Sequence, residues 1–280
     1  METCDTSKGT IVLIHGLWLT PKSWEPWKAR YERAGYTVVV PAFPGVSDDI
    51  AQLCRDPSGL NGLSMGVIFD HLTRLVERIV EETGEQPIIM GHSLGGLALQ
   101  VLLDRGLGKA GVAIHGGQSA GFFTLPLSVA RATLAIFGKP WNTHGTILLS
   151  PRQFHFAFTN TMTREASDLV RQRLQIPAPT WPIWQAALGM MRNAGDARID
   201  YAKPDRAPLL FIAGGADNIV PATVNRRNAA MYTTGIVEVQ EFPGRSHFTC
   251  GQDGWETIAD HALRWAEDHV APGREIAFQA

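Results

Sequence analysis

The chain has 280 residues, of which 45% are hydrophobic and 19% are charged, and its formal net charge is -2. This balance is typical of a soluble globular protein and contains no charged run that would indicate nucleic-acid binding. The first residues are polar, and no stretch of about 18 apolar residues predicts a membrane span. An odd number of cysteines without a secretory signal favours reduced thiols, so we expect a cytoplasmic protein.

Short apolar runs, rich in β-branched residues and followed by glycine or proline, recur along the chain. Runs of this length and composition suit strands that are buried on both faces, as in a parallel sheet. We predict strands near residues 10–14, 37–40, 87–90, 111–114, 209–212 and 237–240.

Helical spacing of apolar residues lies between these runs. It predicts helices over residues 66–82, 94–105, 221–232 and 254–269. Strands that alternate with helices form βαβ units, in which the strands of the sheet run parallel. The predicted fold class is therefore α/β.

The segment between the fourth and fifth runs has about ninety residues, far more than a crossover helix and its loops need. It is rich in large apolar side chains and has a helical pattern at residues 164–174. We predict a helical cap at residues 118–203 and a core formed by residues 1–117 and 204–280. Ten Lys and Arg against five Asp and Glu between Gly116 and Ala207 fit either anionic substrates or a solvated helical face.

The pattern G-x-S-x-G occurs three times, around Ser64, Ser93 and Ser119. A serine becomes a nucleophile when a tight strand-to-helix turn projects its Oγ atom and a base accepts its proton. The stretch before Ser64 is polar and rich in turn residues, which fits a helix cap. No helical pattern follows Ser119. Ser93 alone stands directly between a predicted strand and a predicted helix, so we expect Ser93 to be the nucleophile.

A catalytic serine needs a histidine that accepts its proton and an acid that orients the histidine. In a parallel sheet these groups come from loops at the C-terminal ends of later strands. Asp217 follows the fifth run and His247 follows the sixth. The order serine, aspartate, histidine is the one used by serine hydrolases of this architecture.

Several motifs in order along the chain resemble those of the α/β-hydrolase superfamily. They are His15-Gly16-Leu17-Trp18, Phe43-Pro44-Gly45, Gly91-His92-Ser93-Leu94-Gly95-Gly96 and the stretches at 215–221 and 244–247. The resemblance implies an α/β-hydrolase fold in which Ser93 is the nucleophile, His247 the general base and Asp217 the orienting acid. It also implies an oxyanion hole formed by the backbone N–H groups of Leu17 and Leu94. Because no antiparallel hairpin precedes the first run, we expect about six strands, all parallel.

Substrate contacts are predicted from the oxyanion loop, from the end of the fourth run and from the insertion. The candidates are Trp18, His115, Phe122, Phe158 and Trp184. For His115 the alternative is a buried histidine satisfied by hydrogen bonds, and we expect His15 to fix the oxyanion loop. No pair of histidines or acids has metal-ligand spacing, and no glycine-rich phosphate loop follows a strand, so we predict no metal and no cofactor.

The sequence thus predicts a serine hydrolase that cleaves carboxylic esters of small to medium, apolar or aromatic substrates through an acyl-enzyme. The expected partner is a small-molecule ester, and we predict binding to neither nucleic acid nor a membrane. The sequence does not distinguish between a monomer and a homodimer. On the same fold the alternatives are a lactonase, a C–C hydrolase, a cofactor-free haloperoxidase or perhydrolase, and a dioxygenase, because a fold does not fix its chemistry. A ligand receptor that retains the triad and an inactive relative are the alternatives from other classes.

Overall fold

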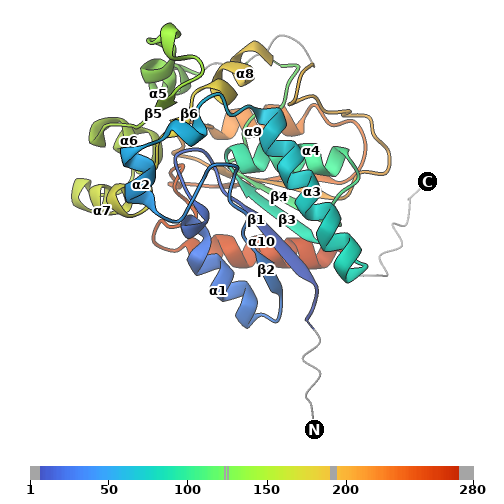
Figure 1. Ribbon diagram of the computed structural model, residues 1–280. Helices are drawn as coiled ribbons and strands as arrows, with labels where there is room; N and C mark the ends of the chain where they lie inside the picture. The colour runs from blue at the N-terminus through green and yellow to red at the C-terminus, as the bar shows by residue number, and fades with distance from the viewer. Residues whose placement is uncertain (1–6, 123, 125, 190–193, 271–280) are drawn as a thin grey trace.

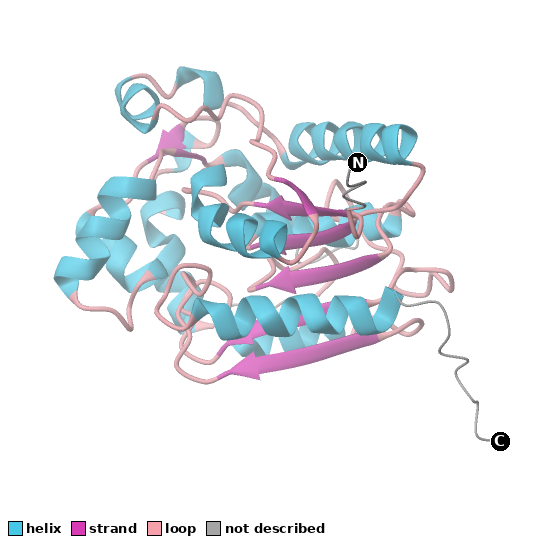
Figure 2. Ribbon diagram, turned by 90° about the horizontal axis from the view of Figure 1, so that it is seen from below, coloured by secondary structure: helices cyan, strands magenta, loops and turns pink. Residues whose placement is uncertain are grey.

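A six-stranded sheet forms the centre of the molecule, in the order β2-β1-β3-β4-β7-β8. The computed structural model describes residues 7–122, 124, 126–189 and 194–270. The strands are β1 (Thr10–Ile14), β2 (Thr37–Val39), β3 (Ile88–His92), β4 (Ala110–Ile114), β7 (Leu209–Gly214) and β8 (Val237–Phe242). Neighbouring strands of this sheet are parallel, as Figure 2 shows. The predicted parallel strands and the α/β fold class are confirmed.

Alternate residues of the strands face two separate apolar cores, which explains why the runs are continuously apolar. In β1, Val12 and Ile14 pack in one core with helices α3 (Met65–Thr83) and α4 (Leu94–Asp104). Ile11 and Leu13 pack in the other core with α1 (Glu25–Arg33) and α10 (Trp255–Val270). Figure 1 shows these two pairs of helices on opposite faces of the sheet. Each fully buried aliphatic side chain stabilises the folded protein by about 1.5–3 kcal/mol relative to the same side chain exposed to water.

The helices predicted around the sheet are present with small changes at their ends. The pattern at 221–232 forms α9 (Ala222–Ala229), because the amides of Met231 and Tyr232 bond three residues back and close the last turn. Helix α1 and the short α2 (Ile50–Arg55) were not predicted. Short 3₁₀ helices are also present: η1 (Pro21–Trp24), η2 (Ser58–Leu60) and η3 (Pro140–Asn142).

Between β4 and β7 the chain forms a group of helices that Figure 1 places beyond one end of the sheet. They are α5 (Leu127–Phe137), α6 (Pro151–Phe158), α7 (Arg164–Leu174) and α8 (Trp181–Gly189). The strands β5 (Thr146–Ile147) and β6 (Ala178–Pro179) pair antiparallel beside them and are too short to be visible as a sequence pattern. The division into a core and a cap at 118–203 stays a prediction. Within the described ranges, no helix is both long enough and apolar enough to cross a bilayer.

Candidate active site

Ser93 occupies a sharp turn between β3 and α4. Its φ of 54° and ψ of -117° lie in a region that residues other than glycine rarely adopt. Ser93 holds the N-cap position of α4, but its side chain makes no capping hydrogen bond. Ser93 is one of the residues that line a cavity. The strained turn therefore places Ser93 at the cavity with a hydroxyl that does not cap the helix.

The turn leaves no space for side chains at the two glycines of the motif. A Cβ atom at Gly91 would overlap the carbonyl oxygen of Gly95, and a Cβ atom at Gly95 would overlap that of Ile14. The strand and the helix therefore approach each other as closely as a nucleophile elbow requires. The first glycines of the other two matches are not crowded in this way, because a Cβ at Gly62 would meet no atom within 4 Å and a Cβ at Gly117 would make ordinary contacts from 3.4 Å. A Cβ at Gly66 would lie 3.0 Å from the side chain of Asp196, and not against the backbone of a neighbouring strand or helix.

The other two serines of the pattern have structural partners. The Oγ atom of Ser64 accepts a hydrogen bond from the amide of Val67 and caps α3, as predicted. Ser119 is buried, and its hydroxyl donates to Oδ1 of Asn228 at 2.5 Å and lies 2.9 Å from the hydroxyl of Tyr201. Ser93 is thus distinguished from Ser64 and Ser119 by both its backbone and its surroundings.

Two backbone amides lie beside Ser93. Leu94 is the first residue of α4, so its amide has no acceptor within the helix. The loop that carries Leu17 is close, because a Cβ atom at Gly16 would lie 2.8 Å from the Cβ atom of Ser93. In the part of the chain that the structure describes, neither amide donates to a protein acceptor, and both residues line the cavity. Two unpaired amides beside a nucleophile suit an oxyanion hole.

His15 holds the loop of Leu17 in place. Its Nδ1 atom donates to the carbonyl oxygen of Gly16 at 2.9 Å, and its Nε2 atom accepts from the amide of Phe43 at 3.2 Å. Burial lowers the pKa of His15 to about 4, although the bond to Gly16 opposes this change. The imidazole is therefore neutral near pH 7 and can donate and accept at once. The hydrogen bonds predicted for His15 are present, and the oxyanion role of the loop stays a prediction.

His247 and Asp217 form a hydrogen-bonded pair at the ends of β8 and β7. Nδ1 of His247 lies 2.7 Å from Oδ2 of Asp217, and the two side chains are 1% and 0% exposed. Oδ1 accepts from the amides of Ile219 and Val220 at 2.7 and 2.9 Å. Burial by itself would raise the pKa of Asp217, but the electrostatic interaction with His247 and the hydrogen bonds from His115 and His247 lower it well below its usual value.

The donor in this pair follows from the ionised carboxylate. A carboxylate only accepts hydrogen bonds, so Nδ1 of His247 donates to Oδ2 and leaves Nε2 as the outer nitrogen of the ring. This Nε2 atom is buried and has no hydrogen-bond partner in the structure. In particular, the Oγ atom of Ser93 makes no hydrogen bond to it. The bond between a nucleophile and its base is often long without substrate and shortens when substrate binds.

His92 connects the loop of His247 to the serine turn. Its Nε2 atom donates to the carbonyl oxygen of His247 at 2.7 Å, and the two rings lie 4.6 Å apart between centroids. Burial and the two neighbouring histidines lower the pKa of His92 well below its usual value. Because His92 directly precedes Ser93, this neutral ring places the serine and His247 in the same neighbourhood.

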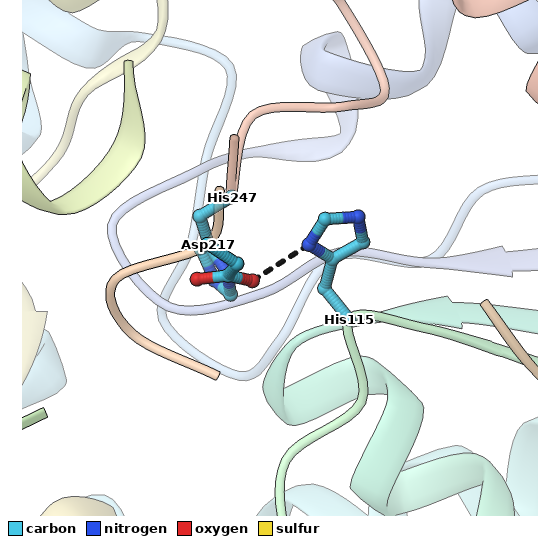
Figure 3. Close-up of side chains that lie close together, drawn as sticks. All are labelled: His115, Asp217 and His247. Atoms are coloured by element: carbon cyan, nitrogen blue, oxygen red, sulfur yellow. Dashed lines mark hydrogen bonds and ion pairs between the residues drawn. The ribbon is translucent and has the colours of Figure 1, made fainter. Parts of the chain in front are cut away.

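His115 also bonds to Asp217, which the sequence did not predict. Its Nδ1 atom donates to Oδ2 at 2.6 Å (Figure 3). Because Nδ1 of His247 bonds to the same atom, two histidines converge on one carboxylate oxygen. The ring is 1% exposed, and burial lowers the pKa of His115 more than Asp217 raises it. The predicted substrate contact from His115 has no support here, because His115 is not among the described residues that line the cavity. A partner 102 positions away leaves no local signal in the sequence.

The cluster of His115, Asp217 and His247 also has the residue types that bind metal ions, and its ligand atoms lie within 4.8 Å of one another. Both Nδ1 atoms, however, carry protons that point at the carboxylate, whose second oxygen accepts from two amides. Metal ligands must be deprotonated and must lie about 2.0–2.2 Å from a zinc ion. The contacts therefore fit a hydrogen-bonded network better than a metal centre.

The model for the family described as the alpha/beta hydrolase family matches residues 11–261. The chain belongs to this family. A comparison with curated proteins gave no match.

The solved structures that resemble this α/β-hydrolase include lipases and a methylketone synthase. A monoacylglycerol lipase of Paleococcus ferrophilus is 21% identical with a TM-score of 0.65, over 94% of this chain and 95% of that one. A soluble variant of monoglyceride lipase from Saccharomyces cerevisiae is 13% identical with a TM-score of 0.73, over 97% and 90%. Tomato methylketone synthase I is 16% identical with a TM-score of 0.67, over 94% and 100%. At these identities the likeness concerns the fold.

The cavity of this hydrolase encloses about 150 Å³ beside Ser93. Its described lining residues are all uncharged and most of them are aliphatic. Two of its polar side chains are already bonded to backbone, Gln118 to the carbonyl of Phe122 and Thr133 to that of Val129. An apolar cavity of about 150 Å³ is large enough for a ring the size of benzene. None of the basic residues in the segment between Gly116 and Ala207 is among the described residues that line the cavity.

The aromatic residues predicted to contact the substrate of this hydrolase lie at different depths. Trp18 lines the cavity. Phe158 packs edge-on behind Trp18, with 5.9 Å between ring centroids, and Trp184 packs edge-on against Phe137 at 4.8 Å. Phe137 itself lines the cavity, whereas Phe122, Phe158 and Trp184 are not among the described lining residues. Sequence reasoning missed Phe137 because helical spacing does not reveal which face of α5 points at Ser93.

The segment between β4 and β7 is also bonded to the loops that carry Asp217 and His247. The hydrogen bonds run from Asn160 Nδ2 to the carbonyl of Ala216, from Asn218 Nδ2 to that of Phe156 and from the amide of Phe248 to that of Phe158, each at 2.9 Å. The end of α6 and the turn after it are therefore part of the framework of the site.

Proposed function

We propose that this α/β-hydrolase cleaves carboxylic esters through an acyl-enzyme, with Ser93 as nucleophile, His247 as general base and acid, and Asp217 as orienting acid. The observation that carries the proposal is the position of Ser93 in a strained turn beside an apolar cavity. The buried pair of His247 and Asp217, whose outer nitrogen has no partner, supports it.

The first half of the reaction forms the acyl-enzyme. Oγ of Ser93 attacks the ester carbonyl carbon while Nε2 of His247 accepts the hydroxyl proton. Negative charge develops on the carbonyl oxygen, and the amides of Leu17 and Leu94 donate to it. Asp217 stabilises the imidazolium through the proton on Nδ1. The alcohol then leaves with the proton held at Nε2, and the acyl group stays on Ser93.

The second half releases the acid. Water takes the place of the alcohol, His247 accepts one of its protons, and the resulting hydroxide attacks the acyl carbon. The second tetrahedral intermediate is again stabilised by the two amides. When it collapses, Oγ of Ser93 recovers its proton from His247 and the carboxylic acid departs. The enzyme returns to its starting state without a cofactor.

The lining of the cavity supports an uncharged, apolar acyl or aryl group as the part of the substrate bound beside Ser93. Burying a charged group there would cost several kcal/mol, because the described lining offers no opposite charge. A volume of about 150 Å³ favours small to medium groups. Lactones react through the same steps and are included in this class.

The test combines a fluorophosphonate probe with a panel of nitrophenyl esters of increasing acyl length. We expect covalent labelling at Ser93 and turnover that is fastest for short to medium acyl chains. Ser93→Ala should abolish both. Ser64→Ala is the matched control, because it changes a serine of the same sequence pattern whose hydroxyl caps α3, and it should keep labelling and turnover.

Three other outcomes would contradict the proposal. Label on Ser64 or Ser119 would assign a different nucleophile. Labelling of Ser93 followed by hydrolysis of only about one equivalent would indicate a ligand receptor. Oxygen uptake or peroxide-dependent halogenation without ester turnover would indicate another chemistry on the same fold.

A further inference from the structure

We propose that His115 is a positioning residue of the active site, which holds the carboxylate of Asp217 in the orientation that His247 requires. The inference rests on the proposed function. Its basis is that one oxygen, Oδ2 of Asp217, accepts from Nδ1 of His115 at 2.6 Å and from Nδ1 of His247 at 2.7 Å. The common triad needs only the second of these bonds.

The hydrogen bonds to Asp217 fix the carboxylate completely. Oδ1 accepts from the amides of Ile219 and Val220, and Oδ2 accepts from the two histidines. The two amides hold Oδ1, whereas without His115 the only donor to Oδ2 would be His247, the ring that must move during the reaction. His115 gives Oδ2 a second donor, and its ring approaches from β4, a different element from the loop of His247 (Figure 3).

The ring of His115 is itself fixed by its surroundings. Its backbone has a φ of 48° at the end of β4, and its amide donates to the carbonyl oxygen of Ile212 at 2.7 Å. On the neighbouring strand a Cβ atom at Gly214 would overlap Cε1 of His115, so the ring occupies space that only glycine leaves open. The ring of His247 lies edge-on at 5.8 Å between centroids. Because the ring is held in this way, its Nδ1–H group can keep Oδ2 of Asp217 in one position.

A second donor matters most when His247 becomes an imidazolium. The positive charge then attracts Oδ2, and an Oδ2 atom bonded only to His247 would be drawn toward the ring as it moves. With His115 bonded to the same oxygen, Asp217 stays in place and the imidazole turns toward Ser93 from a constant angle. His115 does not touch the substrate, and it transfers no proton in this scheme.

The test compares His115→Asn with His115→Leu in the full-length protein. The side-chain amide of Asn places an N–H donor where Nδ1 of histidine stands, and Asn tolerates a positive φ. Leu has the same branching without a donor. We expect His115→Leu to lower kcat on a nitrophenyl ester by about 10- to 100-fold, the loss typical when the hydrogen-bond partner that orients a metal-bound histidine is removed. KM should stay within about twofold, and His115→Asn should keep kcat within about threefold of the wild type.

Proton NMR of protein labelled with ¹⁵N-histidine gives a readout that packing alone would not move. The wild type should show two low-field Nδ1–H signals that disappear in Asp217→Asn, and His115→Asn should keep only the signal of His247 at its wild-type position. His115→Leu should shift that signal. This part of the test needs only the wild type and His115→Asn, so it stands if the Leu variant does not fold.

The inference is overturned if the wild type shows a single low-field signal, or if the Asn and Leu variants lose kcat equally. It is also overturned if folded His115→Leu keeps its kcat. The proposed function fails in a different way, through the absence of probe label and turnover in the wild type. In that case the NMR signals still decide whether His115 holds Asp217.

Discussion

The side-chain amide of Asn218 donates a hydrogen bond of 2.9 Å to the carbonyl oxygen of Phe156 and so joins the loop of Asp217 to the end of α6. Asn218 directly follows Asp217, and the reverse connection runs from Asn160 to the carbonyl of Ala216. Through these two bonds, the end of α6 and the turn after it help to hold the loop that carries the Asp217 carboxylate.

Removing the hydrogen bond between Asn218 and Phe156 should make both the loop of Asp217 and the end of α6 more mobile. For Asn218→Ala we expect a loss of about 1 kcal/mol in the free energy of unfolding, the usual contribution of one hydrogen bond. Amide hydrogen exchange over residues 151–160 should become faster, and kcat should fall several-fold. The exposed Asn61 serves as control, because Asn61→Ala should leave exchange and kcat unchanged. Unchanged exchange in Asn218→Ala would show that the bond carries no such support.

The glycines of the elbow should be intolerant of any side chain. Gly95→Ala places a methyl group on the carbonyl oxygen of Ile14, and neither backbone segment can move away without disturbing the sheet. We expect a loss of at least about 3 kcal/mol in the free energy of unfolding, or insoluble protein. Gly59→Ala is the matched control, because its Cβ atom would meet nothing within 4 Å, and its change should stay within about 0.5 kcal/mol. Urea unfolding measures both.

Asp217→Asn should reduce kcat by about 10⁴-fold, as the same change does in a Ser-His-Asp triad where it imposes the wrong tautomer on the histidine. The reason here is that Oδ2 accepts from two Nδ1–H groups, whereas an amide nitrogen in that place would donate. Steady-state kinetics with a nitrophenyl ester and circular dichroism separate lost activity from lost fold. Asp253→Asn, at an exposed position, is the control and should behave as the wild type. A loss below about tenfold in Asp217→Asn would contradict the assigned role.

Stability should fall as the pH is lowered below neutrality. Burial lowers the pKa of His15, His92 and His115, and that of His15 to about 4. Below the pKa of about 6.5 that these groups have in the unfolded chain, the unfolded state binds protons that the folded state does not, so the free energy of unfolding decreases as the pH falls. For His15 this amounts to about 3 kcal/mol between pH 7 and pH 4.

Urea unfolding at pH 7, 6, 5 and 4 measures this dependence. His15→Asn removes the titrating group at that position, so its curve should be less steep than that of the wild type. A wild-type stability that stays constant from pH 7 to pH 4.5 would contradict the burial of neutral histidines.

The size of the cavity should set the preferred length of the acyl group. Ala186 lines the cavity from α8, and Ala186→Leu fills part of about 150 Å³. Each excluded methylene is worth about 1–3 kcal/mol of discrimination, so kcat/KM for a nitrophenyl octanoate should fall at least about tenfold relative to the acetate. Leu188→Ala on the same helix is the control, because Leu188 is exposed to solvent. Equal effects on both esters would indicate that the acyl group binds elsewhere.

Much of the fold could be predicted because its signals are local. A strand buried on both faces must be continuously apolar, and the glycines around Ser93 are required by contacts within one strand–turn–helix unit. The order of Ser93, Asp217 and His247 follows from the order of the strands that carry them. The sequence by itself therefore determined the parallel sheet, the helices on its faces and the position of Ser93 in a turn between a strand and a helix.

The tertiary structure decided what depends on contacts between distant segments. His115 and Asp217 meet only because β4 and β7 are neighbours in the sheet, so no local pattern could reveal their bond. The lining of the cavity depends on how α5 and α8 are turned, and this is why Phe137 faces the cavity while Trp184 packs behind it. Helical periodicity gives the apolar faces of a helix, but the packing of the whole chain determines which of them the substrate meets.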